Sequence, residues 1–438
     1  MQMQQLFRGA TLLTCDAAHR ILPDHDLLIE DGRIVSLQPT GGPVPDGTAV
    51  IEAAGKIIMP GLVQAHVHLV QSLFRGMADD LALLDWLRTR IWPLERAHDE
   101  ESAYWSARLG LTEMLLGGTT AILDMATVRH TDAVFQAAAE AGLHAFIGNA
   151  MMDRDNEAGL GASTEDNLAE AERLRLRWHG KDKLRFAYAP RFVPSCSDEL
   201  LSEVGRQARL HGCIVHTHAS ENRDEVALVR ELTGRDNIIH LHELGISGPH
   251  VALAHCIHLT REEEHLLATT QTTVIHCPGS NAKLASGLAR VPELRAAGVR
   301  VALGADGAPC NNRLDAFAEM RLAALLQKPR LGAEVMTASD VLNMATVAGA
   351  EALGLSAGQL APGRDADLVL LDPDMPHSIG GGPADSAVVY AMTPANVRGV
   401  WVGGERLVED GAVAGWDTTE TLRGARAALD RVRRRAGL

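Results

Sequence analysis

Residues 56–68 read Lys-Ile-Ile-Met-Pro-Gly-Leu-Val-Gln-Ala-His-Val-His, an apolar run that ends in two histidines separated by one residue. The continuous hydrophobic stretch predicts a strand buried on both faces, with His66 and His68 where that strand ends. Because residues i and i+2 of a strand point to the same side, both imidazoles can reach one point. Neutral imidazole is a ligand for zinc and iron. The pair is a weak signal alone, so the stretch predicts half of a metal site that needs ligands from elsewhere.

Four later apolar runs also end in ionisable residues. The residues at these ends are His216 and His218, His255, His276, and Asp306. Buried strands rarely carry such groups without partners, because an unpaired buried charge is expensive. Parallel strands with ionisable residues at their C-terminal ends are typical of the catalytic face of a (β/α)8 barrel of the TIM type.

Strand-like and helical segments alternate from about residue 57 to about residue 350, as in such a barrel. Residues 101–117 have the apolar spacing of a helix that stops at Gly117-Gly118, and Thr260 to Glu263 form a capping-box signature that opens another. The eight predicted strands cover residues 61–66, 119–124, 144–149, 184–189, 213–218, 251–255, 272–276 and 300–306.

The two ends of the chain have a different pattern, of short strands without long helices between them. The predicted strands are 6–14, 26–30 and 33–37, with a hairpin turn at Asp31-Gly32, and 367–371 and 397–403. Neither terminal piece can form a stable sheet alone. We therefore predict an α/β protein with three parts. They are a small composite β-sandwich domain (1–57 and 360–415), the barrel (58–359) and a C-terminal helical segment (416–438), whose helix covers 419–437.

Composition and charge narrow the class of protein. The 438 residues carry a net charge of −15, which argues against binding to nucleic acid or to an anionic membrane surface. Residues 1–5 lack the basic and apolar regions of a secretory signal, and no apolar stretch approaches the length of a membrane span. The six cysteines are scattered, without a CxxC pair. These features predict a cytoplasmic enzyme with reduced, packed thiols.

The ionisable strand ends can be combined into one hydrolytic metal site. Such a site needs three or four protein ligands and one position for water. His66, His68, His218 and Asp306 can supply the ligands from the first, fifth and eighth strands. The predicted cofactor is one divalent ion, zinc or ferrous iron, since both accept these ligands. The role of His216, which shares a face with His218, stays open, and His276 has the pattern of a structural core histidine.

Several motifs are spread along nearly the whole chain: 60–62 before His66-Val67-His68, 118–120, 216–221, 254–256, 276–281 and 303–307. With them the chain resembles the amidohydrolase superfamily. Four further motifs, 73–76, 85–87, 91–95 and 308–312, resemble in particular its deaminases of 5′-deoxyadenosine, 5′-methylthioadenosine and S-adenosylhomocysteine. Binuclear members of the superfamily bridge two metals with a modified lysine at the end of the fourth strand. That strand ends here in Tyr188-Ala189-Pro190-Arg191, so the resemblance implies one metal.

The resemblance implies a role for several side chains. Glu95 would hold the ribose hydroxyls and Trp86 would line the pocket, although Trp86 also fits a core position on an amphipathic helix. A carboxylate suits a diol because it accepts two hydrogen bonds at once. For the chemistry we predict that Asp306 is the general base, that Glu221 gives a proton to ring N1, and that His255 stabilises the tetrahedral adduct.

A second set of residues leaves the identity of the substrate undecided. Gln71 with Arg191 and Phe192 resembles the base-binding elements of guanine deaminases. Guanine, oxidised guanine, pterins and triazines therefore remain alternatives to a 5′-modified adenosine. A dihydropyrimidinase-type hydrolase is disfavoured by the missing lysine, and a non-catalytic relative by the intact set of ionisable residues. The expected partner is a small purine nucleoside, and the expected assembly a homo-oligomer, dimer or tetramer.

Overall fold

The apolar run at residues 57–63 is divided between two sheets in the computed structural model, which describes residues 4–154 and 159–438. β5 (Ile57–Pro60) belongs to a sheet built from the two ends of the chain, whereas β6 (Leu62–His68) is the first strand of a barrel. The first predicted barrel strand, 61–66, is therefore confirmed as β6, whereas the prediction that the whole apolar run forms one strand is wrong. The division falls at Gly61. A Cβ atom there would lie 2.1 Å from Oγ1 of Thr120, so only glycine allows this segment to lie so close to Thr120.

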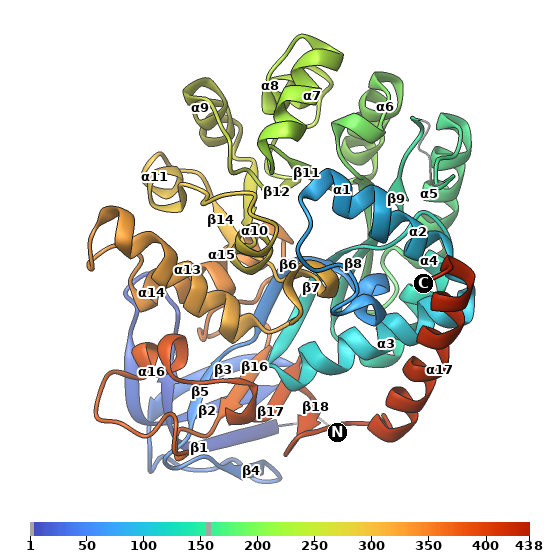
Figure 1. Cartoon of the computed structure of the whole chain (residues 1–438). Coiled ribbons are helices and arrows are strands. Elements are labelled where there is room, and N and C mark those ends of the chain that lie inside the picture. Colours follow the sequence, from blue (N-terminus) through green and yellow to red (C-terminus); the bar gives the residue numbers. More distant parts are fainter. Residues whose placement is uncertain (1–3, 155–158) are drawn as a thin grey trace.

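The barrel strands are parallel to their neighbours and follow one another around a ring (Figure 1), which confirms the predicted fold class. The eighth strand is broken into two pieces. The first piece pairs with the seventh strand, and the second pairs with β6 and closes the ring. Between them, a Cβ atom on Gly304 would lie 2.7 Å from the carbonyl oxygen of His66. The remaining barrel strands are β7 (Thr119–Met125), β8 (His144–Gly148), β10 (Leu184–Pro190), β11 (Ile214–Ala219), β12 (Val251–His255), β13 (Thr273–His276), β14 (Val301–Leu303) and β15 (Asp306–Gly307), with the short β9 (Ala150–Met151) beside β10.

Helices surround the ring of strands (Figure 1). The predicted helix at 101–117 is present and begins at an Asp99 cap, and the Thr260 capping box is present too. The main helices are α3 (Glu100–Leu116), α4 (Thr131–Ala141), α5 (Thr164–Trp178), α6 (Asp198–His211), α7 (Arg223–Thr233), α8 (Asn237–Glu243), α9 (Arg261–Thr270), α11 (Val291–Ala296), α13 (Ala316–Leu331), α14 (Ala338–Ala345), α15 (Val347–Ala352) and α16 (Ala384–Tyr390). Short helices on the loops at the C-terminal ends of the strands are α1 (Leu83–Trp86), η2 (Leu87–Ile91), α2 (Trp92–Arg96), α10 (Pro278–Lys283) and α12 (Ala308–Asn311).

The strands from the two ends of the chain lie side by side below the barrel in Figure 1 and form one mixed sheet. Its order is β19-β18-β17-β16-β5-β1-β2-β3, with β4 beside β1. Apolar side chains from both ends, including Phe7, Ile58 and Trp401, share one core. The predicted hairpin at Asp31-Gly32 joins β2 to β3. The strands are β1 (Gln4–Leu13), β2 (Ile21–Glu30), β3 (Arg33–Pro39), β4 (Ala49–Glu52), β16 (Leu368–Leu371), β17 (Val397–Val402), β18 (Glu405–Glu409) and β19 (Ala412–Val413).

The C-terminal segment forms α17 (Thr418–Ala436), which agrees with the helix predicted over 419–437. This helix packs along α3. Residues 1–3 lie outside the described residues. They belong to the predicted terminal domain and to the N-terminal segment that lacks the features of a secretory signal. All six cysteines are buried and free. No helix in the described ranges is long and apolar enough to cross a membrane.

Candidate metal centre and active site

Four side chains meet at the C-terminal end of the barrel. Nε2 of His66 and Nε2 of His68 each lie 3.2 Å from Oδ1 of Asp306. Nε2 of His68 lies 3.2 Å from Nε2 of His218. One ligand atom from each of these four residues lies within 4.8 Å of the others. β6, β11 and β15 thus bring together the four residues that the sequence predicts as ligands.

The hydrogen bonds around this cluster show that it fits a cation. Nδ1 of His68 lies 2.8 Å from the carbonyl oxygen of Met125, and Nδ1 of His218 lies 2.6 Å from that of Arg191. A carbonyl only accepts, so both Nδ1 atoms carry the proton, and in neutral rings the two Nε2 lone pairs face each other. Burial holds the pKa of His218 well below its usual value. Burial also lowers the pKa of His68, but Asp306 outweighs it and leaves a net rise. The two facing lone pairs and the nearby carboxylate of Asp306 form a set of donor atoms that fits a metal ion.

Two further histidines of the barrel interior lie outside the four-residue cluster. His216 contacts His66, with its Nε2 atom 2.7 Å from Nδ1 of His66, and so lies behind a ligand. His276 is buried, and neither ring nitrogen has a hydrogen-bond partner among the described residues. Burial lowers the pKa of His276 to about 3, so the ring is neutral.

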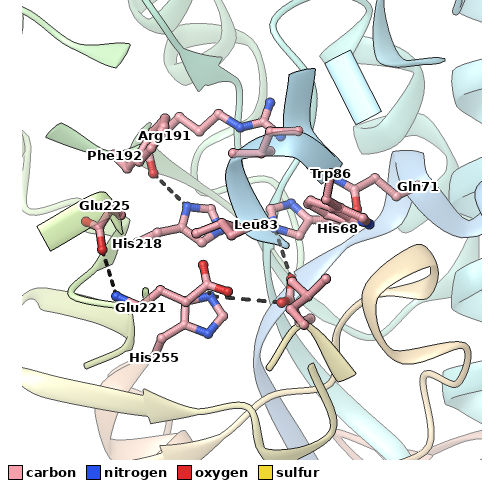
Figure 2. A pocket seen from close by; sticks show the side chains of 13 residues that line it. His68, Gln71, Leu83, Trp86, Arg191, Phe192, His218, Glu221, Glu225 and His255 are labelled. Carbon is pink, nitrogen blue, oxygen red and sulfur yellow. Dashed lines mark hydrogen bonds and ion pairs between the residues drawn. The ribbon is translucent and has the colours of Figure 1, made fainter. Parts of the chain in front are cut away.

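Two of the side chains predicted for proton transfer, Glu221 and His255, lie near His218 of the cluster (Figure 2). Nε2 of His255 is 3.5 Å from Oε2 of Glu221 and 3.9 Å from Oδ2 of Asp306. Burial raises the pKa of Glu221. It would do the same for Asp306, but the charges and hydrogen bonds of His66 and His68 hold that pKa well below its usual value. The two buried carboxyl groups thus differ in their affinity for a proton, as an acid and a base must.

Three neighbours that the sequence did not single out hold these groups in place. Ser280 Oγ donates to Oδ2 of Asp306 at 2.6 Å, and Ser286 Oγ donates to Oε1 of Glu221 at 3.1 Å. Oδ1 of Asn281 lies 2.8 Å from Nδ1 of His255, which leaves Nε2 of His255 directed at the carboxylates. Ser280 and Asn281 belong to the 276–281 motif, so this motif is the sequence feature from which their place in the site could have been predicted.

The strand ends that carry this chemistry are bent out of ordinary strand geometry. His255 has φ +73° and Asp306 has φ +62°, both in the left-handed region that non-glycine residues rarely adopt. Such strain is typical of functional sites, where the surrounding structure compensates for it.

A pocket opens above the cluster, between the loops that follow the barrel strands (Figure 2). Four predicted substrate-binding residues, Gln71, Trp86, Arg191 and Phe192, line it. Leu83 and Leu87, on the same short helical segment as Trp86, and Leu284 add apolar surface, and Glu225 also lies in the wall. The sequence did not identify these four, because loop conformation brings them to the pocket.

Comparison with known proteins agrees with the fold. Residues 57–407 match the model of the amidohydrolase family. The chain belongs to the amidohydrolase family. It is a hydrolase that acts on carbon–nitrogen bonds of cyclic amidines.

Curated relatives of this amidohydrolase extend over most of its length. It is 41% identical to a 5′-deoxyadenosine deaminase of Methanothermobacter thermautotrophicus, over 88% of this chain and 89% of that protein. It is 37% identical to a 5-methylthioadenosine/S-adenosylhomocysteine deaminase of Desulfitobacterium hafniense, over 93% and 94%.

Solved structures with the same fold include enzymes of more than one specificity. An adenosine deaminase from Xanthomonas campestris with bound zinc has a TM-score of 0.93 and 31% identity, over 99% of both chains. A zinc complex of atrazine chlorohydrolase from Arthrobacter aurescens has a TM-score of 0.90 and 26% identity, over 97% of this chain and 100% of that one. Guanine deaminase of E. coli has a TM-score of 0.83 and 28% identity, over 93% and 99%.

Glu95 is not among the residues that line the pocket of the amidohydrolase in its described ranges. Nη1 of Arg191 donates to Oε2 of Glu95 at 2.7 Å, and Nη2 donates to Oε1 at 3.1 Å. Nε2 of Gln71 donates to the same Oε1 at 2.8 Å. Burial would raise the pKa of Glu95, but Arg191 and Gln71 hold it below its usual value, so the carboxylate is charged. The predicted contact of Glu95 with a ribose stays a prediction.

Proposed function

We propose that this amidohydrolase deaminates the adenine ring of a 5′-modified adenosine, such as 5′-deoxyadenosine, 5′-methylthioadenosine or S-adenosylhomocysteine. The products would be the inosine analogue and ammonia. The observation that carries this proposal is the arrangement of Glu221, His255 and Asp306 around three histidine nitrogens at the floor of the pocket. The curated relatives that deaminate such nucleosides support the choice of substrate.

His66, His68, His218 and Asp306 would hold one divalent ion, zinc or iron. Bound there, the ion would supply a water activated for attack at neutral pH. The end of β10 carries Arg191 and no lysine, which supports one ion and not two.

The chain's own groups would handle the protons. Asp306, with its lowered pKa, would accept the proton of the attacking water as general base. Glu221, with its raised pKa, would deliver a proton to ring N1, so that the carbon–nitrogen double bond can accept the water without a free anion. His255, whose Nδ1 proton is held by Oδ1 of Asn281, would donate a hydrogen bond from Nε2 to the incoming oxygen when its ring carries a second proton. Asp306 would then pass the proton it holds to the amino group, Glu221 would take the proton of the new hydroxyl group, and ammonia would leave as the carbonyl of the product forms.

The walls of the pocket would hold the purine. Trp86 and Phe192 supply aromatic surface, and Trp86 Nε1 is a buried donor without a partner among the described residues. Gln71 and Arg191 supply polar groups on the same lining. The oligomeric state and the cytoplasmic location stay predictions.

A second candidate, deamination of a free base such as guanine, oxidised guanine or a pterin, is favoured by one observation. Gln71 and Arg191 face the pocket together, whereas Glu95 does not line it. A triazine is the third option, since a hydrolase of that class shares the fold.

A substrate panel would decide between these candidates. Purified enzyme with bound metal, whose content is measured by elemental analysis, is assayed for ammonia release from 5′-deoxyadenosine, 5′-methylthioadenosine, S-adenosylhomocysteine, adenosine, guanine, 8-oxoguanine, a pterin and an aminotriazine. Turnover of the adenosines with kcat/KM well above that of the free bases would support the proposal. Ammonia release from guanine but from no adenosine derivative would overturn it. The Glu221→Gln variant is the control for contaminating deaminases and should be inactive on every compound.

A further inference from the structure

The carboxylate of Glu95 is occupied by two residues of the pocket wall. Its two oxygens receive a fork of hydrogen bonds from Arg191 and a third hydrogen bond from Gln71. The Glu95 side chain is 1% exposed and that of Arg191 is 5% exposed. A bidentate, charge-assisted pair of this kind is among the stronger polar contacts in proteins.

A sugar diol could reach Glu95 only by displacing one of these partners. Separating Glu95 from Arg191 would leave an uncompensated charge in a buried place, which is strongly unfavourable. Displacing Gln71 would leave its amide nitrogen without an acceptor. The resting geometry therefore opposes the direct ribose contact that the family resemblance implies.

The same contacts fix what the pocket wall offers to a substrate. Because Nε2 of Gln71 faces a carboxylate, its Oε1 must point away from Glu95. This Oε1 is buried and has no partner among the described residues. It packs against Gly307, where a Cβ atom would lie only 2.1 Å away, and Gly307 follows Asp306 directly. The side-chain oxygen of Gln71 is thus an unpaired acceptor that is buried beside the residue following the proposed general base.

Arg191 is fixed in the same way. Glu95 uses two of the five N–H donors of the guanidinium group and sets the plane of the fork. The remaining donors belong to a side chain that lines the pocket.

We infer that Glu95 is a positioning residue that acts through Gln71 and Arg191 and does not contact the sugar of the substrate. The inference rests on the proposed function only in taking this pocket as the substrate site. It predicts that the effect of changing Glu95 is independent of a ribose diol, and that it appears even with a substrate that has no sugar.

The test compares two substrates that differ only in the diol, 5′-deoxyadenosine and its 2′,3′-dideoxy counterpart. Glu95→Ala should lower kcat/KM about tenfold to a hundredfold for both, by factors equal within about threefold, because the loss of oriented polar groups is the same in both cases. Most of the loss should appear in KM. Glu95→Gln, which keeps one acceptor for Arg191, should recover part of it. A loss confined to the substrate with the diol would overturn the inference.

The matched control is Glu293→Ala. Glu293 forms a fork with Arg330 on the surface, away from the pocket, so its removal should leave both kinetic constants unchanged. A change as large as that in Glu95→Ala would show that losing any such pair impairs the enzyme, against the inference.

Failure of the proposed function gives a different result. If the wild-type enzyme deaminates guanine and no adenosine, Glu95→Ala is assayed on guanine, which has no ribose. Loss of that activity would support the inference, and unchanged activity would overturn it.

A double-mutant cycle tests the pair without any substrate. Urea unfolding of the metal-loaded wild type, Glu95→Ala, Arg191→Ala and the double variant should show non-additive changes, because each single change strands the other charge. Additive changes would show that the pair does not exist in solution and would overturn the inference.

Discussion

Replacement of Glu221 by glutamine removes the proposed proton donor with little change of shape. The Gln side chain can still accept from Ser286, whose Oγ lies 3.1 Å from Oε1 of Glu221. The backbone N–H at position 221 keeps its 2.8 Å bond to Oε2 of Glu225. Neither the fold of this loop nor the walls of the pocket should change, so we expect KM to stay within about threefold of the wild type.

The turnover number should collapse, because an amide cannot give its proton to ring N1. General acid–base catalysis typically contributes about two to four orders of magnitude, which corresponds to about 2.7–5.4 kcal/mol in the barrier. Steady-state kinetics of ammonia release on the best substrate of the panel measures both constants, with metal content checked in each preparation. Glu262→Gln, on the exposed face of α9, is the matched control and should behave as wild type. Equal losses in kcat and in binding would mark Glu221 as a positioning group, and a kcat near that of the wild type would refute the assignment.

The remaining predictions concern the metal, the base and pH. His218→Ala should lose metal and activity, while circular dichroism should show that the barrel stays folded. The control His265→Ala, on the exposed face of α9, should keep both metal and activity. A fully metallated, active His218→Ala would contradict the ligand assignment. Asp306→Asn should retain a good share of the metal, and its rate should fall by about two to four orders of magnitude; a rate near wild type would place the proton acceptor elsewhere. Burial raises the pKa of Glu319 to about 8. Its contribution to stability is therefore present below its unfolded pKa and is lost as the pH rises through about 8, and Glu319→Gln should flatten this decline in urea unfolding of the metal-loaded enzyme. An identical pH slope in Glu319→Gln and wild type would show that Glu319 titrates normally.

The barrel and the cluster at its end could be predicted because short-range rules determine them. The alternation of a strand puts His66 and His68 on one side, and parallel strands place His218 and Asp306 at the same end. The division at Gly61 is harder to predict, since the apolar pattern continues without a break and only Pro60-Gly61 marks the change. The strand β18 was missed although Gly403-Gly404, both with positive φ, form the kind of two-residue turn that joins hairpin strands.

The pairing of Glu95 with Arg191 could not be predicted, because it joins residues 96 positions apart on two loops. A family motif indicates which residue types stand at these positions, but it does not reveal which hydrogen bonds they make when the neighbouring residues differ. Sequence resemblance assigned Glu95 to a ribose and Arg191 to a base, as separate alternatives. The structure shows that the two side chains bind each other, so one cannot be assigned without the other.

Arg191 also connects this pair to the metal cluster. Its backbone carbonyl accepts from Nδ1 of His218 at 2.6 Å, while its side chain holds Glu95. One residue directly after β10 thus orients a proposed metal ligand through its backbone and lines the proposed substrate pocket with its side chain. Because the first contact uses only the backbone, replacement of Arg191 can change substrate choice and leave the ligand oriented. We therefore predict that changes at Arg191 and Glu95 alter the choice of substrate and leave the proposed metal site intact.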